Sequence, residues 1–168
     1  RHTRLQGDWS SDVCSSDLCH EYGSVITAGP SLQEVRNFMH PNHKVVEFDD
    51  VTTRHFGYVP PTYDQVEEMI RWGEGRTDLL VHCHAGMSRS TATAWGIAIA
   101  NGFDPQEAFN LLKNNHPVET HYVQRGGKQL IELREARPFI PNRLIVKHLE
   151  TLFDLRPGTL RRILDNAN

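Results

Sequence analysis

The sequence has few of the features that mark secreted, membrane-embedded or nucleic-acid-binding proteins. It contains only three cysteines, Cys14, Cys19 and Cys83, which are too few and too irregularly spaced for a disulfide framework. No apolar run approaches the roughly 20 residues that a membrane-spanning helix needs. The N-terminal segment also lacks the apolar core of a signal peptide. We therefore expect a cytoplasmic protein without a membrane segment.

Charge of one sign is equally scarce. Lys and Arg number 18 against 21 Asp and Glu, which gives a net charge of −3, and the basic residues form no long run. A broad surface for nucleic acid or anionic lipid is therefore not expected. The sequence also has 10 histidines, but their spacing matches no familiar ligand set, so we expect neither a metal nor a cofactor.

One segment near the N-terminus differs from the rest of the chain. Residues 8–18, DWSSDVCSSDL, have no hydrophobic periodicity and repeat the pattern Ser-Ser-Asp. They resemble one reading frame of a sequencing-adapter oligonucleotide, and the alternative is a natural Ser/Asp-rich tail. We therefore predict that residues 1–18 are an artefactual or disordered tail and that residues 19–168 form one domain.

From residue 19 onward, strand-like and helix-like patterns alternate. Short apolar or β-branched runs predict strands at 23–28, 43–48 and 78–82. Helices are predicted at 31–39, 63–72, 90–100, 104–115, 142–153 and 159–166, with a less regular one at 122–135 that Gly126 and Gly127 interrupt. The Pro-containing stretch at 49–61 is expected to be a functional loop. This order predicts an α/β fold with a small, mainly parallel central sheet flanked by helices.

The strongest functional signal is the run VHCHAGMSRS at residues 81–90, between a predicted strand and a predicted helix. A phosphate dianion is bound well by inward-pointing backbone N–H groups and the positive end of a helix dipole. Gly86 allows a close backbone approach, and Arg89 can hold two phosphate oxygens with its planar fork. The same field favours the thiolate of Cys83, which can attack phosphorus and form a phosphocysteine intermediate.

Neighbouring residues fit as supporting groups in this loop. Ser90 can hydrogen-bond the sulfur when it becomes the leaving group, and His82 can order the loop backbone and tune the thiol. The predicted substrate-binding positions are His84, Ala85, Gly86, Met87, Ser88 and Arg89. The alternative is that Cys83 is only a small buried hydrophobic residue at a strand end.

The run HCHAGMSRS resembles the phosphate loop of dual-specificity phosphatases, in the cysteine-dependent protein tyrosine phosphatase superfamily. The usual form of that loop is His-Cys-x-x-Gly-x-x-Arg followed by Ser or Thr. FDDV at 48–51 and PPTYDQVEEMIRW at 60–72 are similar to small bacterial predicted tyrosine phosphatases of this class. Pro141-Asn142 and the helix ending in LETLF resemble the element that follows the loop in these enzymes. The similarity extends over roughly residues 22–160, and the stretch at 118–139 departs from it as an expected insertion.

The resemblance implies a protein-tyrosine-phosphatase-like fold, a supporting role for Asn142 and a general acid on an upstream loop. Asp49 and Asp50 follow the predicted strand at 43–48, and the family pattern favours Asp50, with Asp49 as the alternative. Asp64 falls in the first turn of a predicted helix, where an acidic residue complements the helix dipole. Adjacent aspartates are also common in ordinary turns.

The resemblance further implies a phosphoric monoester hydrolase that acts on a phosphorylated protein or a small phosphomonoester. Phosphoinositide phosphatases of the superfamily typically carry lysines in the loop, and this loop has none. The alternatives are a phosphate-binding pseudophosphatase without turnover and a phosphatase of RNA or a phosphoinositide. A rhodanese-like sulfurtransferase also uses a cysteine loop, but Ala-Gly-x-Ser-Arg-Ser is a phosphatase pattern.

Overall fold

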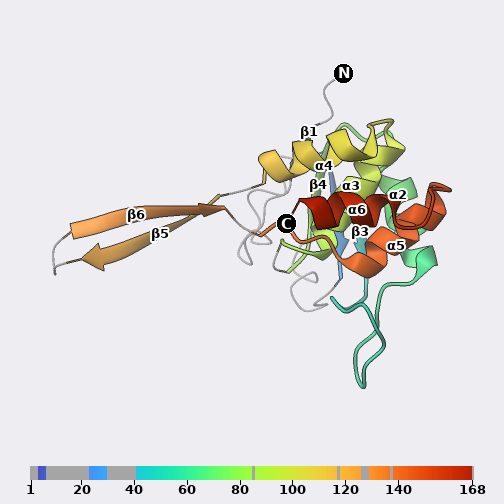
Figure 1. Ribbon diagram of the computed structural model, residues 1–168, viewed down its shortest axis with the longest axis horizontal. Coiled ribbons are helices and arrows are strands. Elements are labelled where there is room, and N and C mark those ends of the chain that lie inside the picture. Colours follow the sequence, from blue (N-terminus) through green and yellow to red (C-terminus); the bar gives the residue numbers. More distant parts are fainter. Residues whose placement is uncertain are drawn as a thin grey trace.

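The computed structural model describes residues 4–6, 23–29, 41–84, 86–116, 118–125, 129–136 and 138–167. Figure 1 shows the elements in chain order: β1 (Arg4–Gln6), β2 (Ser24–Ala28), β3 (His43–Val46), α2 (Tyr63–Gly73), β4 (Asp78–His82), α3 (Arg89–Ala100), α4 (Pro105–Asn114), β5 (Val118–Arg125), β6 (Gln129–Ala136), α5 (Arg143–Leu152) and α6 (Thr159–Asn166). The predicted helix at 31–39 and the segment at 8–18 lie outside the described residues.

The central sheet has four parallel strands in the order β1-β4-β2-β3. Its register pairs Thr27 of β2 with His82 of β4, and Val25 of β2 with His43 of β3. Because the strands are parallel, the loops that follow β3 and β4 leave from the same edge of the sheet. That edge therefore brings residues 49–61 next to the loop that contains Cys83.

The predicted α/β class, with a small parallel sheet flanked by helices, is confirmed. β1 adds a strand from Arg4–Gln6, which pairs with β4 although these residues belong to the predicted tail. The division of the chain at residue 18 stays a prediction.

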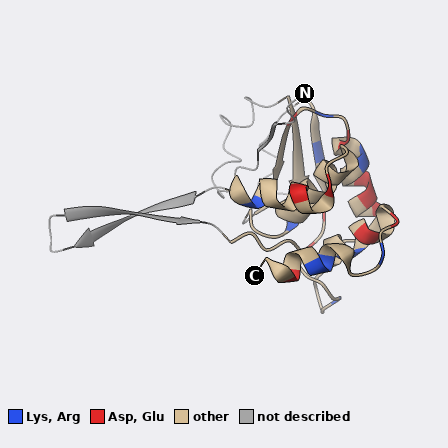
Figure 2. Ribbon diagram, turned by 45° about the horizontal axis from the view of Figure 1, so that its top comes forward, with Lys and Arg blue, Asp and Glu red and all other residues tan. Residues whose placement is uncertain are grey.

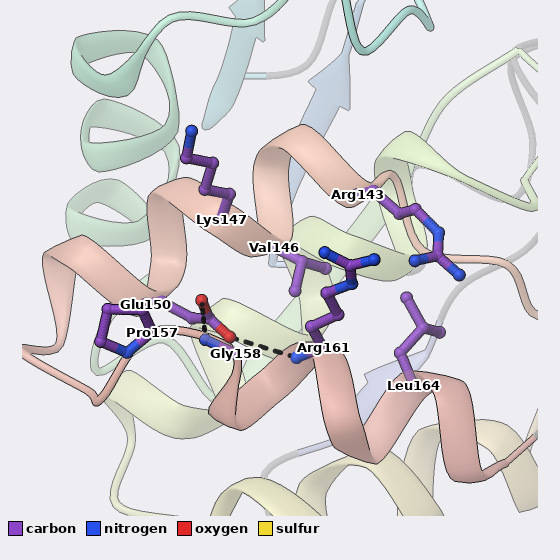
Figure 3. A pocket seen from close by; sticks show the side chains of 8 residues that line it. All are labelled: Arg143, Val146, Lys147, Glu150, Pro157, Gly158, Arg161 and Leu164. Atoms are coloured by element: carbon purple, nitrogen blue, oxygen red, sulfur yellow. Dashed lines mark hydrogen bonds between the residues drawn. The ribbon is translucent and has the colours of Figure 1, made fainter.

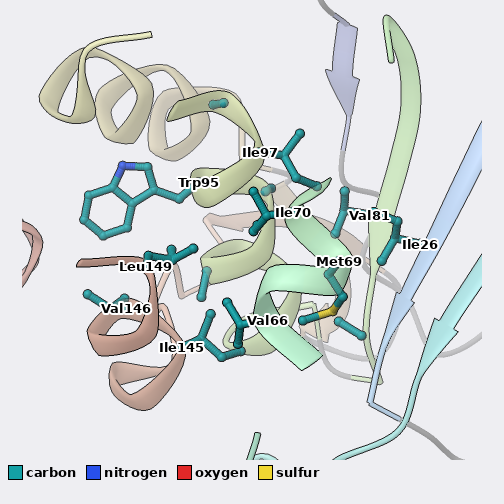
Figure 4. Packing of buried hydrophobic residues seen from close by; sticks show 14 of the residues in the cluster. Ile26, Val66, Met69, Ile70, Val81, Trp95, Ile97, Ile145, Val146 and Leu149 are labelled. Carbon is teal, nitrogen blue, oxygen red and sulfur yellow. The ribbon is translucent and has the colours of Figure 1, made fainter. Parts of the chain in front are cut away.

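α3 is the central helix of the domain. Its residues from Arg89 to Ala98 are all buried, and it packs against β2, β4, α2, α4 and α5. Figure 4 shows the core between these elements, where Trp95 and Ile97 of α3 lie among side chains of α2, α5 and the sheet. The apolar composition of α3 thus fixes the helix that begins directly after the loop that contains Cys83.

Local capping signals fix the starts of three helices. Thr62 and Gln65 form the reciprocal capping box of α2, and Asp104 accepts backbone hydrogen bonds at the start of α4. Asn142 does the same for α5 through the N–H groups of Leu144 and Ile145. Each of these starts agrees with the prediction within one residue.

The predicted helix at 122–135 is wrong. β5 and β6 form an antiparallel pair there, with Val118 opposite Ala136 and Arg125 opposite Gln129. The sequences VETHYVQR and QLIELREA are rich in β-branched, aromatic and large aliphatic residues, which favour strands. Two such runs separated by a short Gly-containing segment are typical of a hairpin.

Acidic and basic residues are interspersed over the helices, as Figure 2 shows. This distribution agrees with the small net charge of −3. Within the described ranges, no helix is both long enough and apolar enough to cross a bilayer.

Candidate active site

The loop between β4 and α3 connects a buried strand to the N-terminus of a buried helix. Buried Leu79, Leu80 and Val81 anchor the strand that enters it, and Gly86 has a φ of 67°, in the left-handed region that glycine favours. Ser88 occupies the N-cap position of α3, but its side chain makes no capping hydrogen bond. The first backbone N–H groups of α3 are therefore not capped by Ser88, and they lie at the positive end of the helix dipole.

Cys83 is buried, with an exposed fraction of 6%, and its Sγ lies 3.1 Å from Oγ of Ser90. Ser90 comes from the first turn of α3 and is fully buried. When the sulfur is a thiolate it can only accept, so the Ser90 hydroxyl then donates. In the thiolate state, the protein itself therefore supplies a hydrogen-bond donor to the sulfur.

Arg89 is a buried cation with few partners. Its exposed fraction is 8%, and its Nη1 donates to the carbonyl of Phe48 over a long 3.4 Å. Its buried Nε has no hydrogen-bond partner among the residues that the structure describes. Oδ2 of Asp50 lies 4.0 Å from Nε. Buried charges are ordinarily paired and hydrogen-bonded, so this guanidinium has unused donors for an anion.

Gly29 makes room for Arg89. It follows β2 with a φ of 78°, and a Cβ placed there would collide with Nη1 of Arg89 and would lie 2.6 Å from the Phe48 carbonyl oxygen. In the sequence this glycine stands between the predicted strand at 23–28 and the predicted helix at 31–39. Its positive φ is visible only in the structure, so the sequence could not connect Gly29 with Arg89.

Asp50, and not Asp49, contacts the loop that contains Cys83. Oδ1 of Asp50 accepts hydrogen bonds from Oγ of Ser88 at 2.7 Å and from Nδ2 of Asn142 at 2.8 Å. Asp49 instead closes its own loop, since its Oδ2 accepts from the Val59 N–H at 2.6 Å and its N–H donates to the Val59 carbonyl at 2.7 Å. Of the two candidate acids, the structure therefore brings Asp50 to the cysteine loop.

Asn142 joins three parts of the site. Its side chain donates to Asp50, its Oδ1 caps α5, and its backbone N–H donates to the Ser88 carbonyl at 3.1 Å. Nearby, the Ile140 N–H donates to the Met87 carbonyl at 3.0 Å. The segment before α5 is thus hydrogen-bonded to Met87 and Ser88, the last loop residues before α3. Of the other predicted loop positions, His84 is exposed and Ala85 lies outside the described residues.

His82 is buried and contacts residues outside this network. Its Nε2 lies 2.7 Å from Oγ1 of Thr27, which also lies 2.7 Å from Nε2 of His43. Burial, and then the nearby His43, lower the pKa of His82 from 6.5 to about 4, so its ring is neutral at pH 7. Neither Thr27 nor His43 could be connected with this site from the sequence alone, because both contacts depend on the pairing of the strands.

A separate hollow of about 380 Å³ lies between α5 and α6 (Figure 3). Its charged groups serve the fold: Glu150 accepts from the backbone of Gly158, Leu160 and Arg161, and Arg143 pairs with Asp165. None of the residues from Cys83 to Ser90 lines it. In the part of the chain that the structure describes, no three His, Cys, Asp or Glu residues lie close enough together to hold a metal ion.

Comparisons with known proteins bear on the fold. No protein-family model matches the chain, and no curated protein matches it by sequence. Human DUSP28 has a similar structure, with a TM-score of 0.50 and 17% identity over 91% of this chain and 94% of that one. Tk-PTP in its active form has a TM-score of 0.48 and 16% identity over 89% and 90% of the two chains. The PTP-2 phosphatase of Cydia pomonella has a TM-score of 0.44 and 22% identity over 70% and 83%.

The similarity to human DUSP28 is a similarity of fold. The resemblance to dual-specificity phosphatases, first visible in the cysteine loop, therefore extends to the α/β architecture that carries this loop.

Proposed function

We propose that this chain is a cysteine-dependent phosphatase that hydrolyses phosphomonoesters through a phosphocysteine at Cys83. One observation carries the proposal. A buried cysteine whose sulfur lies 3.1 Å from a hydroxyl oxygen shares a helix-opening loop with a buried arginine, and the Nε of this arginine has no hydrogen-bond partner among the described residues. A thiol nucleophile, a donor to the sulfur and an unsatisfied cation on one anion-binding turn meet the needs of phosphoryl transfer.

In the first step, Arg89 and the loop N–H groups bind the equatorial oxygens of the phosphoryl group. The Cys83 thiolate attacks phosphorus opposite the leaving oxygen, so an S–P bond forms while the P–O ester bond breaks. Asp50 in its acid form donates its proton to the departing oxygen, and the product is an alcohol or phenol. The enzyme then holds the phosphoryl group on the sulfur.

In the second step, water attacks phosphorus and the S–P bond breaks. The Asp50 carboxylate takes a proton from this water, which restores the acid for the next cycle. The electron pair of the S–P bond returns to Cys83, and the Ser90 hydroxyl stabilises the departing thiolate by donating a hydrogen bond. Inorganic phosphate leaves, and the loop returns to its starting state.

The assignment of Asp50 as general acid is supported by its position. Ser88 and Asn142 hold its carboxyl group against the phosphate loop, 4.0 Å from the Arg89 guanidinium. The Asp49 carboxylate instead accepts a hydrogen bond from the Val59 N–H. Asp50 is therefore the carboxyl group that a bound phosphoester would meet.

Phosphorylated protein is the substrate class that the surroundings favour. The loop that carries Asp50 also carries Phe56, Tyr58 and Val59, whose exposed fractions are 104%, 56% and 51%. A small phosphomonoester could not use this apolar surface, whereas residues that flank a phosphorylated side chain could. The loop positions around Cys83 carry no lysine, so a polyphosphorylated lipid or inositol is less suited.

The proposal is tested with purified chain and p-nitrophenyl phosphate. The parent should hydrolyse it, and Cys83→Ser should retain phosphate or vanadate binding but lose turnover. Arg89→Lys should lose both, since an ammonium cannot replace the bidentate fork. Binding without turnover in the parent chain would instead identify a pseudophosphatase, and unchanged turnover in Cys83→Ser would refute the cysteine mechanism.

A further inference from the structure

The polar contacts behind the phosphate loop constrain where hydrogens can sit. Oγ1 of Thr27 lies 2.7 Å from Nε2 of His82 and 2.7 Å from Nε2 of His43. A hydroxyl has one hydrogen, so Thr27 can donate to only one of the two rings. The other ring must carry a hydrogen on Nε2 and donate it to the hydroxyl oxygen. If Thr27 donates to one ring and both rings are neutral, the two rings therefore have opposite tautomers.

The sheet places these three side chains on one face. Thr27 and His82 are register partners on β2 and β4, and His43 on the neighbouring edge strand β3 lies diagonally opposite Thr27. His82 has an exposed fraction of only 5%, whereas His43 is half-buried. His43 is thus the ring of the pair that exchanges protons with solvent more readily.

We propose that Thr27 and His43 are positioning residues that fix the tautomer of His82: His43 donates to Thr27, and Thr27 donates to Nε2 of His82. This direction suits both forms of His43, because a neutral Nε2–H ring and an imidazolium can each donate. The reverse direction requires a neutral His43 with a free Nε2 lone pair. The low pKa of His82, about 4, is consistent with a neutral acceptor ring beside His43.

The tautomer of His82 affects the nucleophile because His82 directly precedes Cys83 in the chain. With Nε2 accepting, the hydrogen of His82 is on Nδ1, the ring nitrogen closer to the backbone that leads into Cys83. A ring with one tautomer and a fixed orientation holds the start of the phosphate loop in one conformation. This effect on catalysis depends on the proposed phosphatase function, but the tautomer itself does not.

The direct test is long-range ¹⁵N–¹H NMR of the full chain labelled with ¹⁵N-histidine at pH 7, with His82 and His43 assigned from the signals lost in His82→Gln and His43→Gln. His82 is expected to show an Nδ1–H tautomer, with Nε2 as the unprotonated nitrogen. An Nε2–H tautomer for His82, or an averaged pattern from both tautomers, would overturn the proposal. This measurement needs no variant of Thr27 to fold and no enzymatic activity.

A matched pair of variants tests the link to Cys83. Thr27→Val removes the hydroxyl at nearly constant shape, and Thr27→Ser keeps it. In Thr27→Val we expect an averaged NMR pattern from both His82 tautomers. The rate of Cys83 alkylation by iodoacetamide and the kcat for p-nitrophenyl phosphate should each decrease about fivefold, the effect of losing one hydrogen bond. Thr27→Ser should restore all three. Mass spectrometry of the Cys83 peptide separates it from Cys14 and Cys19.

The outcomes distinguish this proposal from the proposed function. Normal alkylation of Cys83 in Thr27→Val, or failure of Thr27→Ser to restore it, would refute the positioning role even if the chain is an active phosphatase. A parent chain that has the expected His82 tautomer and the expected alkylation difference but no turnover would refute the proposed function and leave the positioning role intact.

Discussion

Gly29→Ala should disable Arg89 without replacing any residue that we propose to contact phosphate. The added Cβ would overlap Nη1 of Arg89 and would lie 2.6 Å from the Phe48 carbonyl oxygen. That oxygen belongs to the backbone and cannot swing away, whereas the guanidinium can. The guanidinium should therefore move, and with it the fork that is aimed at phosphate.

The magnitude follows from two separate costs. An alanine with a positive φ costs about 1–2 kcal/mol of folding free energy at any such site. Displacement of a preorganised donor from the transition state costs about 100- to 1000-fold in rate. Gly102→Ala is the matched control, because Gly102 has a φ of 91° and a Cβ there would meet nothing within 4 Å.

The assay is kcat/KM for p-nitrophenyl phosphate, combined with thermal unfolding of both variants. Both should lose stability, with Gly29→Ala losing at least as much as Gly102→Ala. Only Gly29→Ala should lose about 100-fold or more in kcat/KM and bind vanadate weakly. Equal kcat/KM in the two variants would refute the argument that Gly29 creates the space for Arg89.

Three further predictions test other parts of the account. Asp50→Asn should slow the hydrolysis of alkyl phosphates about 100-fold or more, and should slow the hydrolysis of aryl phosphates with good leaving groups much less. Asp49→Asn should affect both kinds of substrate equally, and the opposite pattern would reassign the general acid to Asp49. The pKa of His82 falls from 6.5 to about 4 on folding, so the unfolded chain binds the proton first as the pH drops. The free energy of unfolding should therefore decrease by up to about 3 kcal/mol between pH 6.5 and pH 4. Urea denaturation across this range should show a smaller loss for His82→Gln, and parallel curves would contradict the assignment. Phe56→Ser should lower kcat/KM about tenfold for phosphopeptides but not for p-nitrophenyl phosphate, and Leu111→Ser, which alters an exposed apolar residue on α4, should change neither.

Features that depend on neighbours in sequence were predictable. The caps at Thr62, Asp104 and Asn142 work over three or four residues, so the sequence alone identifies where α2, α4 and α5 begin. The cysteine loop is similarly local, because Cys83 to Ser90 are contiguous and the strand before them is a continuous apolar run.

Features that depend on the sheet register were not predictable. Thr27, His43 and His82 come from three strands, and their hydrogen bonds exist only because β2 lies between β3 and β4. Gly29 likewise matters through Arg89, which lies 60 positions later in the sequence. A single sequence carries no signal of such pairings.

Two other cases show how local signals can stay ambiguous. Asp49 and Asp50 are adjacent and chemically identical, and only the backbone direction at the end of β3 decides which one contacts Ser88. The segment at 118–136 contains both helix-compatible residues, such as Glu, Gln and Leu, and strand-favouring residues, such as Val, Thr and Tyr, so its composition alone does not decide between helix and strand. The glycines at 126 and 127 favoured a turn over an interrupted helix.

The central claim is that phosphorus becomes covalently bound to the sulfur of Cys83. The most direct measurement is acid quenching of the chain during turnover of an aryl phosphate, followed by mass spectrometry of the Cys83 peptide. Asp50→Asn is a suitable background, because loss of the base should slow hydrolysis of the intermediate. The account predicts one phosphoryl group on Cys83, and none in Cys83→Ser. Turnover with no phosphoryl group on Cys83, or with the group on another residue, would contradict it.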